Sequence, residues 1–170
     1  GTAGAGRRAG AGGGTGGSLG LRGATAGGGR ELVGVTDGAR GGAQGWRDLL
    51  LDLTRSGLDV PAQLTIADGA LGFWKAAGEV WPRTREQRCW VHKTANVLNK
   101  LPKTLHSKAK RELQEIWMAE TKANALNAFD VFEKTYAVKY EKAVAFLTKD
   151  RQALLAFYDF PAEHWKHLRT

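Results

Sequence analysis

The sequence predicts an α/β domain with a partly parallel sheet, joined to a segment that is wholly helical. Over residues 31–100, short apolar strands alternate with amphipathic helices, a pattern typical of strands connected by helical crossovers. Over residues 107–160, apolar residues recur only at helical spacing. With 170 residues, 42% hydrophobic and 25% charged, the chain can bury a core of ordinary size.

The first 18 residues differ in composition from the rest of the chain. They are rich in Gly, contain no acidic or aromatic side chain, and carry charge only at Arg7 and Arg8. Such a segment buries too little apolar area to offset the entropy lost on ordering. The sequence therefore predicts a disordered tract over 1–18 and an ordered core over 19–106.

The elements of this core follow one another in a regular order. A β-rich run at 32–36 ends at a turn signal and predicts a strand. A helix is predicted next, because four apolar residues share one helical stripe: Trp46, Leu49, Leu50 and Leu53. A strand at 63–67 then leads into a second helix, whose apolar side holds Phe73, Trp74, Ala77 and Trp81. A short strand at 88–91 and a helix from Thr94 complete the core.

Residues 107–160 are predicted to form helices that pack through aromatic and aliphatic stripes. Successive stripes hold Leu113, Ile116 and Trp117, then Leu126, Phe129, Phe132 and Tyr136, then Val144 and Leu147, and finally Leu154, Leu155 and Tyr158. Pro102 and Pro161 mark the edges of the segment. We expect the aromatic residues to be core rather than ligand contacts.

Positive charge is concentrated in residues 83–111. This window holds nine basic side chains and a single acid, so its net charge of +8 equals that of the whole chain. Such a block is typical of proteins that bind a phosphate backbone, although a solvated basic surface has the same composition. The candidate DNA-binding residues are Arg83, Arg85, Arg88, Lys93, Lys100, Lys103, Lys108, Lys110 and Arg111.

Other features of the composition argue against several classes of protein. A single cysteine excludes an internal disulfide framework and fits a reducing compartment. No apolar run approaches the roughly 20 residues that span a bilayer, and no secretory signal precedes the core. We therefore expect a cytoplasmic protein without a membrane partner.

Asp68 is the first candidate site residue, because it follows an apolar strand and precedes a helix. In α/β sheets, ligands bind at the carboxyl ends of such strands, where an acid can reach a metal ion. An Asp before a helix is also a common N-cap. The local sequence alone leaves both roles open.

Cys89 and His92 form the second candidate, since Cys-x-x-His has the spacing of a zinc ligand pair. With one cysteine in the chain, further ligands have to be histidines or acids. His164 and His167 share a helical face and could supply them. A buried thiol beside a hydrogen-bonded imidazole explains the same residues without zinc.

Five long blocks together resemble the Mutator-type bacterial insertion-sequence transposases. They read GRELVGVTDG, QGWRDLLLDLTRSGL, IADGALGFWKAAGEVWP, REQRCWVHKTANVLNKLPK and LLAFYDFPAEHWKHLRT. The resemblance extends from about Leu21 to Thr170. It implies an RNase H-like catalytic domain of the DDE class, with residues 107–160 as a helical insertion and 161–170 as the start of the return to the core.

The resemblance also implies a chemistry. Three carboxylates would hold two Mg²⁺ or Mn²⁺ ions, which activate water and then a DNA 3′-hydroxyl. Asp68 matches the second acid, and Cys89 and His92 match a Cys-x-x-His motif of the family. The implied partners are DNA, as terminal repeats and target, and further copies of the protein, with the enzyme at the nucleoid when bound.

The chain departs from the family at two acids of this triad. Residues 1–30, where the first would lie, contain no acid, and the sequence ends before the motif that carries the third. Asp37 and Asp59 match no triad position. We therefore expect this chain to be inactive, and two alternatives remain: a DNA-binding or self-associating fragment, and a zinc-stabilised structural domain.

Overall fold

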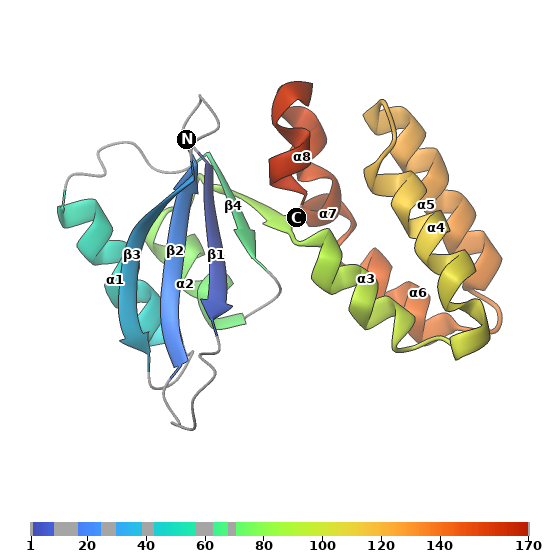
Figure 1. The fold of residues 1–170 in the computed structure, drawn as a ribbon, viewed down its shortest axis with the longest axis horizontal. Coiled ribbons are helices and arrows are strands. Elements are labelled where there is room, and N and C mark those ends of the chain that lie inside the picture. Colours follow the sequence, from blue (N-terminus) through green and yellow to red (C-terminus); the bar gives the residue numbers. More distant parts are fainter. Residues whose placement is uncertain are drawn as a thin grey trace. The chain divides into compact units, whose positions relative to one another are not determined.

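The computed structural model describes residues 2–8, 17–24, 30–38, 43–56, 63–67 and 71–169, with side chains from residue 43 onward. The chain divides into two units, Gly1–Glu86 and Gln87–Thr170 (Figure 1). The first unit contains a sheet with two helices. The second begins within the last strand of that sheet and contains only helices and turns from Trp90 onward.

The sheet contains five strands in the order β3-β2-β1-β4-β5. Their bounds are Thr2–Arg8 (β1), Gly17–Ala24 (β2), Arg30–Gly38 (β3), Leu64–Ala67 (β4) and Arg85–Arg88 (β5). The first three strands form an antiparallel meander, and β4 pairs with β1 in parallel. Near β5, the Arg85 amide donates to the Gln63 carbonyl at 3.1 Å. The sheet is therefore mixed, as the sequence predicted.

The Gly-rich tract differs from its prediction. Disorder was expected over 1–18, but β1 occupies Thr2–Arg8 and β2 begins at Gly17. The prediction rested on side-chain burial, which Gly and Ala supply poorly. Strand pairing uses backbone N–H and C=O groups, and these are present whatever the side chain.

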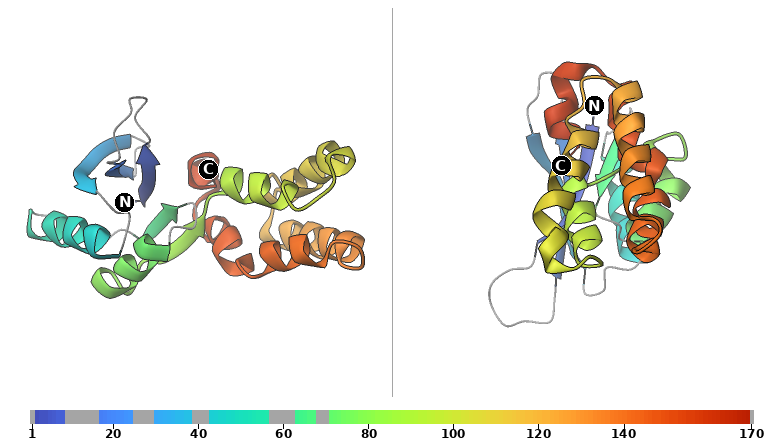
Figure 2. Two further views of the ribbon diagram at one scale, coloured as in Figure 1. Left: turned by 90° about the horizontal axis from the view of Figure 1, so that it is seen from below. Right: turned by 90° about the vertical axis from the view of Figure 1, so that its right-hand side faces the viewer.

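Helices α1 (Ala43–Arg55) and α2 (Leu71–Val80) lie together on one face of the sheet (Figure 2). Their shared core contains every apolar residue of the two predicted stripes. The Trp46 and Phe73 rings meet edge to face, with centroids 5.1 Å apart. The Trp81 indole donates to the Thr54 hydroxyl at 3.3 Å. These two helix predictions are confirmed.

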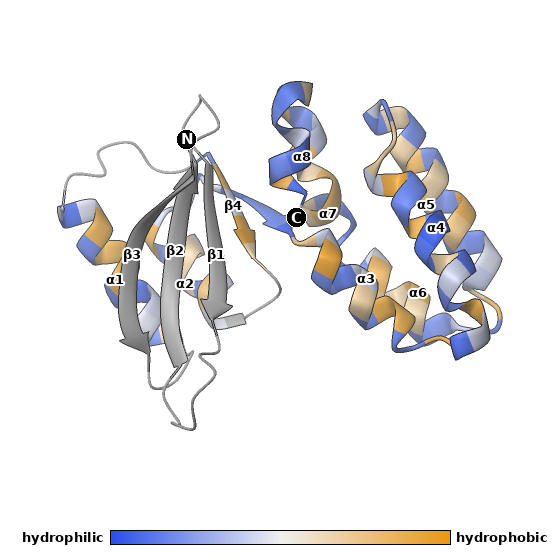
Figure 3. Cartoon of the chain, viewed as in Figure 1, coloured by the Kyte–Doolittle hydropathy of each residue, from blue (hydrophilic) through white to orange (hydrophobic). Residues whose placement is uncertain are grey.

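The second unit is built from helices connected by short turns. The α-helices are α3 (Trp90–Leu98), α4 (His106–Trp117), α5 (Lys122–Tyr136), α6 (Glu141–Thr148), α7 (Arg151–Leu155) and α8 (Trp165–Leu168). Three 3-10 turns join them, at Lys103–Leu105, Ala156–Asp159 and Ala162–His164. Hydrophobic and hydrophilic residues alternate along α3 to α8 (Figure 3), so each of the longer helices has one apolar side.

The apolar sides of these helices form the core predicted from the stripes. Phe129, Phe132 and Leu147 are fully buried, as are Leu113 and Ile116. Trp117 and Leu126 are only half-buried. Thr121 caps α5 by accepting a hydrogen bond from the Asn124 amide at 3.1 Å.

The boundary between the two units lies further toward the N-terminus than predicted. The sequence placed it at 106/107, whereas the structure divides the chain after Glu86. Gln87 is completely buried and joins the helical unit through two hydrogen bonds. Its side-chain amide donates to the Leu154 carbonyl at 2.9 Å, and its oxygen accepts from the Phe157 amide at 2.8 Å. Residues 161–168 also pack here, because the Trp165 ring contacts Phe157 and Tyr158.

The start of α3 also differs from the sequence prediction. β5 ends at Arg88 and α3 begins at Trp90, so the strand and helix both begin earlier than expected. Among the described residues, no helix has the length and hydropathy needed to cross a membrane.

Candidate functional site

The acid that the sequence places after a buried strand, Asp68, lies outside the described residues, as does Asp59. The elements on either side of Asp68 are described: β4 ends at Ala67 and α2 begins at Leu71. All four residues of β4 are buried. Because β1 and β4 are parallel, the chain leaves β4 at the same end of the sheet as it leaves β1.

β1, the parallel neighbour of β4, carries no acid. β1 reads TAGAGRR, and its pairing with β4 runs from Thr2 opposite Leu64 to Gly4 opposite Ile66. Asp37 lies on β3, opposite Ser18 of β2, and β2 and β1 separate β3 from β4. At about 4.8 Å per strand spacing, Asp37 is roughly 14 Å from the line of β4.

Cys89 and His92 lie together at the start of the helical unit. Cys89 is the residue before α3 and is 8% exposed, while His92 is an exposed residue in the first turn of that helix. The His92 Nδ1 atom lies 3.2 Å from the Cys89 Sγ atom. One turn of helix brings the two side chains into contact, as their spacing predicts.

The other two proposed zinc ligands do not join this pair. His164 and His167 lie near the C-terminal end, and the His164 ring lies 3.5 Å from the Glu163 carboxylate. Within residues 43–56, 63–67 and 71–169, no three His, Cys, Asp or Glu side chains are grouped so that they could hold a metal. The four-ligand arrangement, one of the two alternatives that the sequence left open, is therefore not formed by Cys89, His92, His164 and His167.

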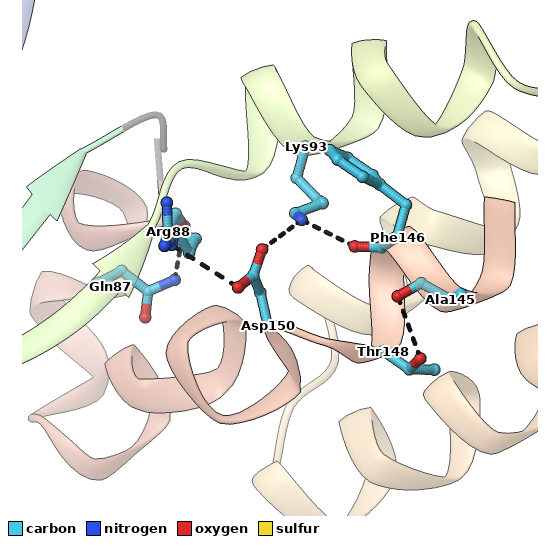
Figure 4. A network of polar contacts seen from close by, with 7 residues as sticks. All are labelled: Gln87, Arg88, Lys93, Ala145, Phe146, Thr148 and Asp150. Atoms are coloured by element: carbon cyan, nitrogen blue, oxygen red, sulfur yellow. Dashed lines mark hydrogen bonds and ion pairs between the residues drawn. The ribbon is translucent and has the colours of Figure 1, made fainter. Parts of the chain in front are cut away.

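Two of the nine candidate DNA-binding residues belong to a buried polar network (Figure 4). The Lys93 ammonium, with its side chain 5% exposed, contacts the Asp150 carboxylate at 2.5 Å and donates to the Phe146 carbonyl at 2.9 Å. The Arg88 guanidinium lies 3.9 Å from the other Asp150 oxygen, and its side chain is 14% exposed. Both cations face the same carboxylate and both side chains are largely buried, so neither is exposed as a surface contact for DNA.

Burial lowers the pKa of Lys93, although the hydrogen bond and charge of Asp150 pull that pKa upward. The acid in this network was not identified from the sequence. Position 93 is on α3 and position 150 is in the turn between α6 and α7, far apart in the chain, and no periodic pattern connects them. The one feature of the sequence that could have indicated such a network is the position of Asp150, an acid at the junction of two helices in a basic chain.

The remaining seven basic residues have exposed side chains. Arg83 and Arg85 belong to the first unit, and the other five to the second: Lys100, Lys103, Lys108, Lys110 and Arg111. Lys108 is 3.7 Å from the Glu112 carboxylate, an exposed i, i+4 pair of small energetic weight. The five residues of the second unit form a positively charged segment from the end of α3 to the middle of α4.

A family model described as "Transposase, Mutator family" matches residues 21–170. The chain belongs to the Mutator transposase family. The match contains Asp68, the Cys89–His92 pair and the whole helical unit, whereas β1 precedes it.

Several curated transposases are similar to this Mutator-family chain. The transposase for insertion sequence element IST2 of Acidithiobacillus ferrooxidans is 58% identical over 148 residues, which cover 87% of this chain and 50% of that protein. The transposase for IS6120 of Mycolicibacterium smegmatis is 54% identical over 141 residues, covering 83% and 43%. The transposase for ISRM5 of Rhizobium meliloti is 27% identical over 141 residues, covering 83% and 35%. The chain spans about half the length of the first two relatives.

Proposed function

We propose that this chain is the central part of a DDE-class transposase whose catalytic core is RNase H-like. The proposed reaction of the intact protein is cleavage of DNA at the ends of an insertion element, followed by strand transfer to a target. Asp68 is the proposed second acid of the catalytic triad. The observation that carries this proposal is the family match over residues 21–170, in which Asp68 directly follows the buried strand β4.

The sheet topology supports an RNase H-like core. An antiparallel meander of three strands is extended, on the side of β1, by the parallel strand β4. Residues that follow parallel neighbours leave the sheet at the same end, where ligands bind in α/β folds. An acid at the end of β1 and Asp68 at the end of β4 would therefore lie side by side in the intact enzyme.

The closure of the helical unit supports its role as an insertion. The Trp90 amide, in the first residue of α3, donates to the Arg169 carbonyl at 3.0 Å. The chain therefore returns, after all its helices, to the point where it left β5. In the intact enzyme, we propose that residues after Arg169 continue from this point and bring the third acid to the site.

The residues present do not fit two catalytic metal ions. Two-metal sites hold ions roughly 3.5–4 Å apart between several carboxylates, and Mg²⁺ requires near-octahedral ligation. Only Asp68 matches a triad acid within the 170 residues, β1 offers none, and two strands separate Asp37 on β3 from β4. We infer that the 170-residue chain cleaves no DNA with either Mg²⁺ or Mn²⁺.

This inference is tested with end-labelled duplexes carrying the terminal repeats of the element that encodes the chain. The 170-residue chain should yield neither nicks nor strand-transfer products. A longer protein with an acid-bearing first strand and the C-terminal glutamate should yield both, and Asp68→Asn in that protein should abolish them. Cleavage by the 170-residue chain that disappears with Asp68→Asn would contradict the assignment of the acids.

We also propose a second function, DNA binding without catalysis, favoured by the five exposed basic residues from the end of α3 to the middle of α4. Contacts of this kind neutralise phosphates and do not depend on base sequence. Replacing Lys103, Lys108 and Lys110 with Gln should weaken binding equally for unrelated duplexes and flatten its salt dependence. Unchanged affinity and salt dependence would contradict this function. Self-association is also proposed for the intact protein, and sedimentation of the longer form would test it.

A further inference from the structure

Three lysine ammonium groups lie close to the aromatic ring of Phe146, a residue of α6. The Nζ atom of Lys93 lies 3.9 Å from the centroid of the Phe146 ring, that of Lys149 lies 4.4 Å away, and that of Lys100 lies 5.1 Å away. The three lysines come from the middle of α3, the turn after α3 and the end of α6. We call Lys93, Lys100, Lys149 and Phe146 the Phe146 cluster.

The charges of this cluster are not balanced. Asp150 is the acid that pairs with Lys93 of this cluster, and the Asp150 carboxylate also faces Arg88. Among the described residues, neither Lys100 nor Lys149 forms an ion pair with an acid. Because all three ammonium groups lie close to one ring centroid, they are separated by no more than about one Debye length at 0.1 M salt, roughly 10 Å. Their mutual repulsion is therefore only partly screened.

The ring keeps the lysines together in spite of that repulsion. An aromatic face attracts a cation by about 0.5–1 kcal/mol at an exposed site. Phe146 is half-buried, whereas Lys100 and Lys149 are exposed, so the apolar ring is held by the core and the two cations face solvent. Lys93 differs from them, because it is buried and paired with Asp150. The two accessible cations thus share one aromatic ring, at 5.1 and 4.4 Å from its centroid, and neither is paired with an acid among the described residues.

We propose that Lys100 and Lys149, positioned by the Phe146 ring, bind the phosphate backbone of duplex DNA. The proposal rests on the proposed DNA-binding function. It adds one specific contact, which lies on the helical unit. Lys149 lies outside the basic segment that the sequence identified, and only the fold brings it to Lys100. A phosphodiester backbone fits because each ammonium group can face one phosphate, and the negative charges offset the repulsion between the two lysines. The ring faces are occupied by cations, so the contact is to the backbone and does not involve base stacking.

The test is fluorescence anisotropy of the 170-residue chain with a labelled 30-base-pair duplex of arbitrary sequence, between 50 and 300 mM salt. The variant Lys100→Gln/Lys149→Gln removes the two accessible cations. The control Lys134→Gln/Lys139→Gln removes the same charge from exposed positions on and after α5. Circular dichroism and thermal unfolding establish that both variants are folded.

Each lost phosphate contact should lower the slope of log affinity against log salt by about 0.9, which is roughly eightfold in affinity at 0.1 M salt. The Lys100/Lys149 variant should therefore lose about 1.8 from this slope, and the Lys134/Lys139 control should lose none. Phe146→Leu keeps the charge and most of the apolar volume, and should weaken binding severalfold because the lysines lose their common support.

Three results would overturn the proposal. Equal slopes for the Lys100/Lys149 variant and its control would exclude this contact while leaving DNA binding by other residues intact. Unaltered affinity for Phe146→Leu would exclude the positioning role of the ring. Absence of any binding by the unaltered chain would instead overturn the DNA-binding function, and the present proposal with it.

Discussion

Replacing Asp150 with Ala should destabilise the helical unit by about 3 kcal/mol. The change leaves the Lys93 ammonium, with its side chain 5% exposed, without its carboxylate partner and with only the Phe146 carbonyl as acceptor. Removing one partner of a buried ion pair typically costs about 3–5 kcal/mol. We expect the lower end of that range, because the Asp150 side chain is 17% exposed and solvent screens part of its attraction to Lys93.

The assay is urea unfolding of the 170-residue chain followed by circular dichroism. Lys93→Met is the matched variant, since it removes the buried charge and keeps a long apolar side chain. It should cost less than Asp150→Ala, because Asp150 still has Arg88 nearby. The double variant should be more stable than the sum of the two single losses predicts, by about 1–3 kcal/mol. Additive losses, or a loss below about 0.5 kcal/mol for Asp150→Ala, would refute the reasoning.

The pH dependence provides an independent check on the same pair. Burial lowers the pKa of Lys93 from its ordinary value of 10.5, and removal of Asp150 removes the main influence that raises it. Below the lowered pKa, both folded and unfolded chains carry the charge, so the full penalty is present. As pH rises through the folded pKa toward 10.5, the unfolded chain binds more protons and stability returns. The deficit of Asp150→Ala should therefore be smaller at pH 10 than at pH 7, and a constant deficit would contradict this account.

Three further predictions concern buried polar groups. Burial raises the pKa of Tyr158 to about 12, so the free energy of unfolding should fall as pH rises from 10 through 12. Between pH 9 and pH 11, Tyr158→Phe should lose about 1.4 kcal/mol less of this free energy than the unaltered chain does. Equal losses in the two proteins would contradict the shift. Gln87→Leu should cost about 1–3 kcal/mol in urea unfolding, because the buried Phe157 amide loses its acceptor; a change within 0.5 kcal/mol would show that the structure adapts. Cys89→Ala should lower the thermal midpoint by a few degrees through lost packing, while a chelator should leave the midpoint unchanged; a chelator-induced decrease would restore the zinc hypothesis.

The sequence predicted most of the helices because their burial is periodic. Trp46, Leu49, Leu50 and Leu53 recur at the spacing of one helical face, and all four are buried on α1. The same logic succeeded for α5, where Phe129, Phe132 and Tyr136 are buried. Local spacing is sufficient in these cases, because each helix buries a single apolar side whatever its partner is.

The failures occurred where pairing, rather than local pattern, decides the structure. β1 has no apolar alternation, and it forms by backbone pairing with β2 and β4. Lys93 was assigned to a DNA-binding surface because charge alone does not reveal burial. Its partner Asp150 comes from the turn between α6 and α7, and the ion pair exists only once α3 packs against the end of α6. The Cys89–His92 contact was predictable because it lies within one helical turn, whereas the approach of Lys100 and Lys149 to the same Phe146 ring was not.

The hydrogen bond between the Trp90 amide and the Arg169 carbonyl has a consequence for how such a protein can change over time. A segment whose two ends meet can be lengthened, shortened or removed without displacing the residues on either side of it. The entropic cost of closing a loop grows only with the logarithm of its length, by about 0.6 kcal/mol for each doubling. Helices could therefore be gained or lost between Trp90 and Arg169 with little penalty to the strands that flank them. Relatives of this chain should differ in length between these two positions more readily than within β4 or β5, where one added residue would turn buried side chains outward.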